Sequence, residues 1–289
     1  MSDRRRTPFN GKVAAAHLKG FVEADRYVEA EPKHVAVVVA DLCAEPGGAR
    51  DRQLLRGEAF MCLDVQEAWI FGYAEKDGYV GWIEAASLNG HPSDIPTHRV
   101  SSVRSYGKST PGLKDMGRVT PLPFDARLAV VDEIDGWSRI AWGRGALPRD
   151  LYVPSKHLAR LDFVADDPVA VAELFLGTPY LWGGNSAFGI DCSGLVQAAC
   201  VACDIACPGD SDMQAGELGV YLADDAPLKR GDLLFWEGHV AWVVNPNKIL
   251  HANAHHMAVV HEPLEAAIER IEAQGDGPVI ARKRLEIPT

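Results

Sequence analysis

Two pairs of segments, each pair about 70 residues apart, carry matching patterns of apolar and polar residues, and this repeat restricts the fold more than any other feature. The segment "GEAFMCLDVQEAW" at 57–69 is echoed by "FDARLAVVDEIDGW" at 124–137. In the same way, "WIEAASL" at 82–88 is echoed by "YVPSKHL" at 152–158. Short runs rich in β-branched and aromatic residues, separated by Gly, Pro and Asp, are typical of strands. The sequence therefore predicts two copies of one small β-barrel.

The pattern changes before and after this repeat. Residues 12–28, "KVAAAHLKGFVEADRYV", follow a polar tail and indicate a helix. Residues 167–177 have apolar side chains at helical spacing, with Asp before them and Gly after them, and strand-like runs such as "GDLLFW" and "HVAWVV" come later. Helices followed by antiparallel strands indicate an α+β domain. The predicted order is a tail and helix over 1–33, β-barrels over 34–92 and 98–160, and an α+β domain over 161–289.

The composition excludes several classes of partner. The chain has 289 residues and a formal net charge of −11, so neither nucleic acid nor an anionic membrane surface is expected to attract it. No apolar run reaches the length of a transmembrane helix, and the first residues lack the apolar core of a secretion signal. The six cysteines follow no disulfide framework. We therefore expect a cytoplasmic protein with reduced thiols and no membrane insertion, and the oligomeric state stays open.

The segment "GIDCSGLVQAAC", residues 189–200, places an acid and a cysteine before an apolar run that favours helix. Asp191 is a good N-cap residue, which puts Cys192 at the first helical position. There the helix dipole and the free backbone N–H groups favour a negative charge, so Cys192 is expected to form a thiolate. The same N–H groups are suited to stabilise an oxyanion on a carbonyl that the sulfur attacks.

Two histidines further along the chain are candidates for the base that such a cysteine needs. His239 opens the alternating run "HVAWVV", and His251 lies in the next strand-like run, "KILHAN". A hairpin that turns near Asn245 brings the two histidines opposite each other on the same face. His239 is then placed to pair with the thiol, while His251 holds the second imidazole nitrogen of His239.

Other cysteines and histidines invite a metal interpretation that we do not favour. Cys200, Cys203 and Cys207 form a C-x2-C-x3-C pattern, but the first two lie on an apolar helix face and no fourth cysteine is near. His255 and His256 belong to no H-E-x-x-H motif and are expected in a solvated loop. No metal site is predicted.

Three segments in this order, "YLWGGNSAFGIDCSG", "GDLLFWEGHVAWVV" and "ILHAN", closely resemble the NlpC-type papain-like peptidases of bacterial cell walls. The resemblance covers most of residues 165–260. It implies a papain-like catalytic domain in which Cys192 is the nucleophile, His239 the base and His251 the residue that orients the base. It also implies that the reaction needs no metal or organic cofactor.

The two β-barrels resemble bacterial SH3-like domains, which precede the catalytic domain in cytoplasmic-type members of this family. The resemblance implies a substrate that is a murein-derived peptide, such as L-Ala-γ-D-Glu-diamino acid, cut after γ-D-glutamate. It also implies that the first barrel partly covers the active site and helps to select a free N-terminal L-alanine. The implied substrate-binding residues are Tyr79, Tyr180, Asp191, Ser193 and Glu45.

The sequence leaves other functions open. One is an amidase or acyltransferase of the same fold with another substrate, and a second is an exported peptidoglycan hydrolase. A third is a non-enzymatic binder of wall peptides, although such a binder has no use for an ordered Cys–His–His set. The identity of the diamino acid, diaminopimelate or lysine, is open as well.

Overall fold

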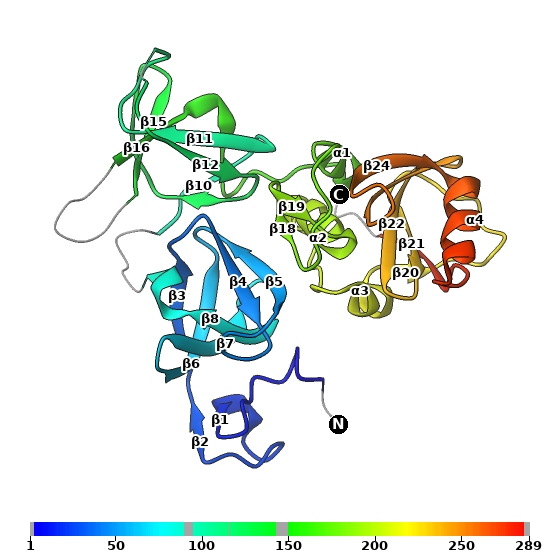
Figure 1. Ribbon diagram of the computed structural model, residues 1–289, viewed down its shortest axis with the longest axis horizontal. Helices are drawn as coiled ribbons and strands as arrows, with labels where there is room; N and C mark the ends of the chain where they lie inside the picture. The colour runs from blue at the N-terminus through cyan, green and yellow to red at the C-terminus, as the bar shows by residue number, and fades with distance from the viewer. Residues whose placement is uncertain (1–2, 90–94, 115, 143–149, 286–289) are drawn as a thin grey trace. The chain divides into compact units, whose positions relative to one another are not determined.

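The computed structural model describes residues 3–89, 95–114, 116–142 and 150–285, and the chain divides into two units, Met1–Phe163 and Val164–Thr289 (Figure 1). The sequence predicts the start of the last domain at residue 161, close to this division. The ends of the predicted ranges 34–92 and 161–289 lie outside the described residues.

The first β unit is one antiparallel sheet with the strand order β5-β4-β8-β7-β6-β3-β9. Its strands are β3 (Glu31–Val35), β4 (Val39–Cys43), β5 (Arg50–Leu55), β6 (Ala59–Gln66), β7 (Trp69–Ala74), β8 (Val80–Glu84) and β9 (Leu88–Asn89). Alternate residues of these strands, among them Phe71, Val80 and Trp82, pack into one buried cluster. The first strand begins three residues before the boundary predicted at residue 34.

Residues 12–28 do not form the predicted helix. They form β1 (Val13–Ala15), a 3-10 turn (Ala16–Leu18) and β2 (Arg26–Val28), which pairs in parallel with β1. The side chain of Asn10 accepts hydrogen bonds from the backbone N–H groups of Lys12 and Val13, at 3.0 and 2.8 Å, which fixes a turn before the segment. Gly20 adopts a φ of 89° after the 3-10 turn. Local turn chemistry therefore overrides the helix propensity of the alanines.

The second β unit repeats the order of elements at the end of the first. Its strands are β10 (His98–Val100), β11 (Arg104–Lys108), β12 (Val119–Pro123), β13 (Arg127–Leu128), β14 (Val130–Ile134), β15 (Trp137–Ala141), β16 (Asp150–Pro154) and β17 (Leu158–Arg160). In both β units a 3-10 turn joins a longer strand to a short one, at Ala85–Ser87 and at Ser155–His157. These turns are 70 residues apart (155 against 85), which matches the offset seen in the sequence.

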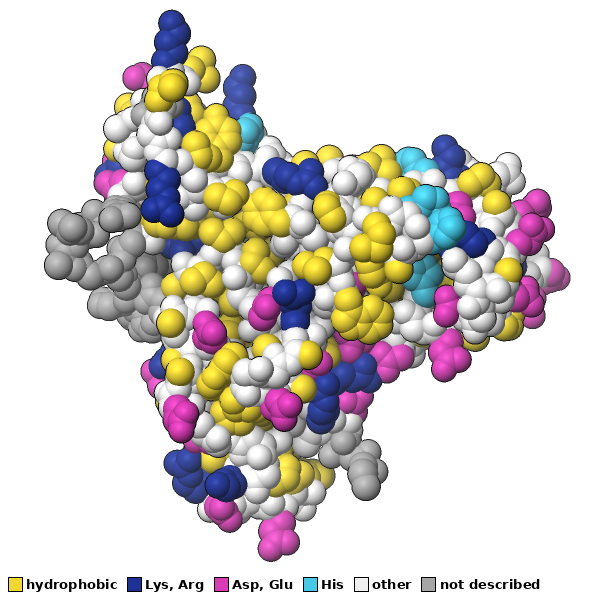
Figure 2. Space-filling view, viewed as in Figure 1, with side chains coloured by type: hydrophobic (Ala, Val, Ile, Leu, Met, Phe, Trp, Pro, Cys, Tyr) yellow, Lys and Arg dark blue, Asp and Glu magenta, His cyan; other side chains and the backbone are white. Residues whose placement is uncertain are grey.

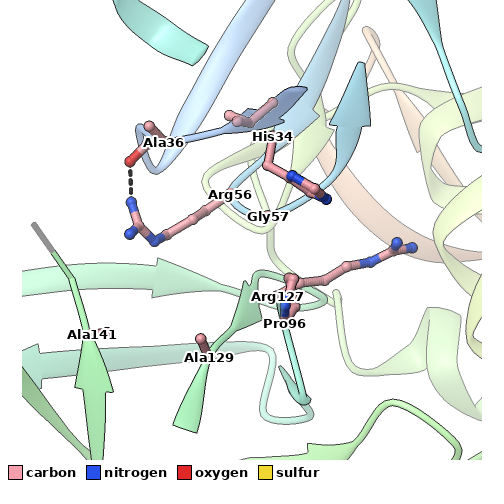
Figure 3. Close-up of a pocket in the computed structure, with 9 residues that line it drawn as sticks. His34, Ala36, Arg56, Gly57, Pro96, Arg127, Ala129 and Ala141 are labelled. Atoms are coloured by element: carbon pink, nitrogen blue, oxygen red, sulfur yellow. Dashed lines mark hydrogen bonds between the residues drawn. The ribbon is translucent and has the colours of Figure 1, made fainter. Parts of the chain in front are cut away.

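Arg56 and Gly57 join the two β units within Met1–Phe163 (Figure 3). The Arg56 guanidinium lies 3.6 Å from the centre of the Trp142 ring and donates hydrogen bonds to the carbonyls of Ala36 and Trp142. Gly57 has a φ of 78°, and a Cβ atom there would lie 2.5 Å from the carbonyl oxygen of Arg127. A side chain larger than hydrogen at Gly57 is therefore incompatible with this contact.

The unit Val164–Thr289 is built on an antiparallel sheet with the order β20-β25-β21-β22-β23-β24. The strands are β20 (Val220–Tyr221), β21 (Asp232–Trp236), β22 (His239–Asn245), β23 (Lys248–Asn253), β24 (Ala258–Pro263) and β25 (Ala281–Arg284), beside a small hairpin of β18 (Asn185–Ser186) and β19 (Gly189–Ile190). The helices are α1 (Pro168–Glu173), α2 (Cys192–Ala202), α3 (Ser211–Glu217) and α4 (Leu264–Gln274).

The core of this unit explains its layers. Ala241, Val243 and Ile249 from one face of the sheet form a buried cluster with Ala267 and Ile271 of α4. Figure 1 shows α2 on the other side of the sheet. Within the described residues, no helix is long and apolar enough to cross a membrane.

Candidate active site

Cys192 lies at the start of α2, as the sequence predicts, and Asp191 caps that helix. One carboxylate oxygen of Asp191, Oδ1, accepts hydrogen bonds from the backbone N–H of Gly194 at 2.6 Å and from the hydroxyl of Ser193 at 3.0 Å. The other, Oδ2, accepts one from the N–H of Gly183 at 3.0 Å. The carboxylate therefore ties the glycine-rich loop to the helix start and holds Cys192 in place.

The strand β22 brings His239 to this helix terminus. The Cys192 Sγ atom lies 3.9 Å from the carbonyl oxygen of Gly238, the residue before His239. The His239 Nε2 atom is 2.9 Å from His251 Nδ1, and the two ring centres are 5.1 Å apart. The structure thus brings together the two histidines that the sequence selects, next to the strand end that contacts the cysteine.

The two histidines are diagonal neighbours and not directly opposite each other, which corrects the predicted register. In the ladder between β22 and β23, Trp242 pairs with Leu250 and Asn245 with Lys248. Continuing this register places Ala241 opposite His251, and His239 is two residues further along on the same face. The shared face was predicted correctly because side chains alternate along a strand.

Two further residues complete the chain of hydrogen bonds, and sequence reasoning missed both. His251 Nε2 lies 3.0 Å from Oε2 of Glu262 on β24. Arg270 of α4 donates to both carboxylate oxygens of Glu262, at 2.9 and 2.7 Å. The only signal for Glu262 in the sequence was its alternating position in the strand that follows His251. Val260 pairs with His251, and Glu262 lies two residues further along, on the same face.

This chain of bonds determines where the protons lie. An ionised Glu262 accepts only, so His251 carries its proton on Nε2 and offers a lone pair at Nδ1. His239 then donates its own Nε2–H to that lone pair, which leaves the lone pair of the other nitrogen, Nδ1, unprotonated. The carboxylate therefore makes His239 a base whose free nitrogen is the one not bound to His251.

The electrostatic surroundings support this assignment. Burial, together with the nearby His251 and Arg270, lowers the pKa of His239 to about 3. Burial also lowers the pKa of His251, against the effect of its bond to Glu262. Although burial opposes it, the bonds from His251 and Arg270 hold the pKa of Glu262 well below its usual value. At neutral pH both imidazoles are therefore uncharged and Glu262 is ionised.

The predicted substrate-binding residues fall into both units. Tyr180 is half-buried and bridges to Ile190, just before the cap of α2. Burial raises its pKa, with further contributions from Cys192 and Asp191. Tyr79 is buried before β8, and Glu45 is exposed after β4, both within Met1–Phe163. The binding roles of these residues, and of Asp191 and Ser193, stay predictions.

Cys200, Cys203 and Cys207 are buried free thiols. Over the described ranges, no group of three or more His, Cys, Asp or Glu side chains is arranged to hold a metal ion.

Comparisons with known proteins agree with this geometry. The model of the NlpC/P60 family matches residues 177–270, and that of the bacterial dipeptidyl-peptidase SH3 domain matches residues 42–88. A gamma-D-glutamyl-L-lysine dipeptidyl-peptidase of Bacillus subtilis is 30% identical over 220 residues, which are 69% of this chain and 71% of that protein. Dipeptidyl-peptidase 6 of Lysinibacillus sphaericus is 35% identical over 88 residues, 30% of this chain and 32% of that protein.

Solved structures share the fold. A crystal structure of an NlpC/P60 family protein from Bacillus cereus superposes with a TM-score of 0.72 at 19% identity, covering 89% of this chain and all of that one. An NlpC/P60 endopeptidase from Photobacterium damselae gives a TM-score of 0.57 at 16% identity, covering 88% of this chain and 71% of that one. Cys192, His239 and His251 all lie inside the matched segment 177–270. With this site geometry and a relative matched over most of both sequences, the chain belongs to the NlpC/P60 family of peptidases.

Proposed function

We propose that this protein is a cysteine peptidase that hydrolyses the γ-D-glutamyl–diamino acid bond of murein stem peptides. Two adjacent observations carry the proposal. The Cys192 Sγ atom contacts the carbonyl oxygen of Gly238, the residue before His239. Hydrogen bonds then link His239 through His251 to Glu262. The substrate class is supported by the B. subtilis relative, whose name describes a gamma-D-glutamyl-L-lysine dipeptidyl-peptidase.

The geometry suits nucleophilic catalysis. His239 takes the proton of the Cys192 thiol, and the sulfur attacks the γ-carbonyl carbon, so a C–S bond forms and the carbonyl electron pair moves to oxygen. The backbone N–H groups at the start of α2 are placed to stabilise that oxygen. When the C–N bond breaks, His239 gives its proton to the leaving nitrogen and a thioester remains. Water then loses a proton to His239 and attacks the thioester, which releases the acid and restores the cysteine.

We further propose that the substrates are free peptides with an N-terminal L-alanine, taken up for cell-wall recycling in the cytoplasm. The second β unit is then an SH3-like domain like the first, which the 70-residue offset of their 3-10 turns supports (155 against 85). Tyr79 and Glu45 of the first domain, with Tyr180, Asp191 and Ser193, are the candidates that bind the substrate around its free amine.

Mass spectrometry of L-Ala-γ-D-Glu-diaminopimelate and of its N-acetylated form tests the proposal. Wild-type protein is expected to release L-Ala-γ-D-Glu from the free peptide only, and Cys192→Ala is expected to abolish the release while keeping the thermal unfolding midpoint. Cleavage of both peptides would support the proposed hydrolysis and refute the selection of a free N-terminal amine. If neither peptide is cut and the counterpart that ends in lysine is not cut either, the proposed reaction is wrong, and acyl transfer or peptide binding takes its place.

A further inference from the structure

A pocket of about 300 Å³ lies beside His239 in the unit Val164–Thr289. It is lined by the turn before β22, the end of β23, the C-terminal half of α4 and the side chains Tyr180 and Trp182. His239 itself lines the pocket. Figure 2 shows that acidic side chains gather over α4 and that histidine side chains lie beside them.

The charges in this pocket do not balance. Glu237 and Asp276 line it and are exposed, and across the described residues neither carboxylate forms an ion pair. The one arginine in the lining, Arg270, already gives two hydrogen bonds to Glu262 and a third to Gln274, at 2.8 Å. The charge that remains available to a ligand is therefore negative, and its complement is a cation.

Asn253 adds a hydrogen-bond donor to the same wall. The residue is 5% exposed, and its Oδ1 accepts a hydrogen bond from the backbone N–H of His256 at 2.8 Å. That bond fixes the orientation of the amide, because only the oxygen accepts. Among the residues that the structure describes, the buried Nδ2 then has no hydrogen-bond partner. A buried donor of this kind costs free energy until an acceptor satisfies it, and an oxygen atom of a ligand is such an acceptor.

We propose that this pocket holds the leaving amino acid of the substrate and binds its side-chain ammonium group through Glu237 and Asp276. The proposal rests on the proposed function, in which the acyl group stays on Cys192 and the amine departs next to His239. A carboxylate or carbonyl oxygen of the same amino acid accepts from Asn253 Nδ2. Lysine and diaminopimelate both carry the required ammonium group, whereas monoamino acids do not.

The experiment compares kcat/KM for four substrates that share the L-Ala-γ-D-Glu acyl part. The leaving groups are lysine, Nε-acetyl-lysine, meso-diaminopimelate and aminomethylcoumarin, the last of which has no ammonium group. Wild-type protein is expected to prefer free lysine to acetyl-lysine by about three- to tenfold, since each partly exposed ion pair contributes a modest amount. The double variant Glu237→Gln/Asp276→Asn is expected to remove that preference, and Glu269→Gln, an exposed acid elsewhere on α4, is expected to retain it.

The outcomes separate the two proposals. If the coumarin amide is cut but acetylation of lysine has no effect, or the double variant keeps the full preference, the pocket assignment is wrong and the proposed function stands. If wild-type protein cuts none of the four substrates, both proposals are wrong. If the double variant loses kcat/KM equally with the lysine and the diaminopimelate substrates, the pocket binds the ammonium group that both share. If kcat/KM falls with only one of these substrates, that amino acid is the natural leaving group.

Discussion

Replacing Glu262 by Gln tests whether the carboxylate behind His251 drives the chemistry. The substitution keeps the size of the side chain and removes its charge. In the transition state His239 carries the proton of the thiol, so it gains a positive charge that Glu262 stabilises through His251. Glutamine also has an NH2 group, and if that group faces His251, it reverses the proton positions on both imidazoles. Both effects lower activity.

The magnitude follows from the geometry. The two hydrogen bonds measure 2.9 and 3.0 Å, and one imidazole ring lies between them. The carboxylate oxygen therefore lies within about 8 Å of His239 Nε2, where one charge is worth about 2 kcal/mol at an effective dielectric constant of about 20. Loss of the charge alone corresponds to about thirtyfold in kcat. Reversed tautomers lower kcat further. The comparable change in a serine-protease triad lowers kcat by roughly ten-thousandfold, which sets the upper end of the expected loss.

The assay is steady-state hydrolysis of L-Ala-γ-D-Glu-aminomethylcoumarin, together with the rate at which iodoacetamide alkylates Cys192. We expect kcat and the alkylation rate to fall while KM stays close to that of wild type. Glu262→Asp, which keeps the charge, is expected to recover part of kcat. A folded Glu262→Gln variant with kcat within threefold of wild type would refute the assignment of proton positions.

Three further predictions concern stability. Gly57→Ala is expected to lower the thermal unfolding midpoint more than Gly136→Ala. Both glycines have a φ of 78°, but only at Gly57 does the added Cβ meet Arg127. Equal decreases in the midpoint would contradict this contact. Asp191→Ala is expected to lower the free energy of unfolding in urea by about 1–2 kcal/mol through loss of the α2 cap, and an unchanged value would exclude a capping role. The pKa of His239 is lowered from 6.5 to about 3, so between these values the unfolded chain binds a proton that the folded chain does not. Stability should therefore fall as the pH drops from about 7 to about 4, less steeply in His239→Asn, and an unchanged slope would count against a buried neutral imidazole.

The parts of the site that the sequence predicted are those that depend on local structure. Asp191 and Cys192 are adjacent, and a cap followed by a helix start is a short-range pattern. His239 and His251 occupy alternating positions of two neighbouring strands, so their shared face follows from the two-residue period of a strand. The N-terminal segment was mispredicted for a related reason, since the turn at Asn10 acts on residues 12–28 more strongly than their average propensity.

Glu262 and Arg270 could not be found in this way, because their positions depend on how β24 and α4 pack. Glu262 pairs with Ile249 in the ladder, two positions from the pair of His251 with Val260, so it reaches His251 only diagonally. Arg270 reaches Glu262 from a helix whose rotation is set by Ala267 and Ile271 in the core. The residue pattern within β24 or within α4 therefore does not predict the contact between Glu262 and Arg270.

The same dependence links catalysis to the register of the sheet. The four residues of this hydrogen-bond chain lie on four elements that follow one another in the sequence: His239 on β22, His251 on β23, Glu262 on β24 and Arg270 on α4. Each hydrogen bond therefore joins two consecutive elements. A slip of one residue in β23 would turn His251 away from the face that carries His239 and Glu262. It would also leave the carboxylate of Glu262 and the guanidinium of Arg270 without the imidazole between them and His239. The bonds that set the proton positions therefore also favour the one strand pairing in which His239 is bonded to His251.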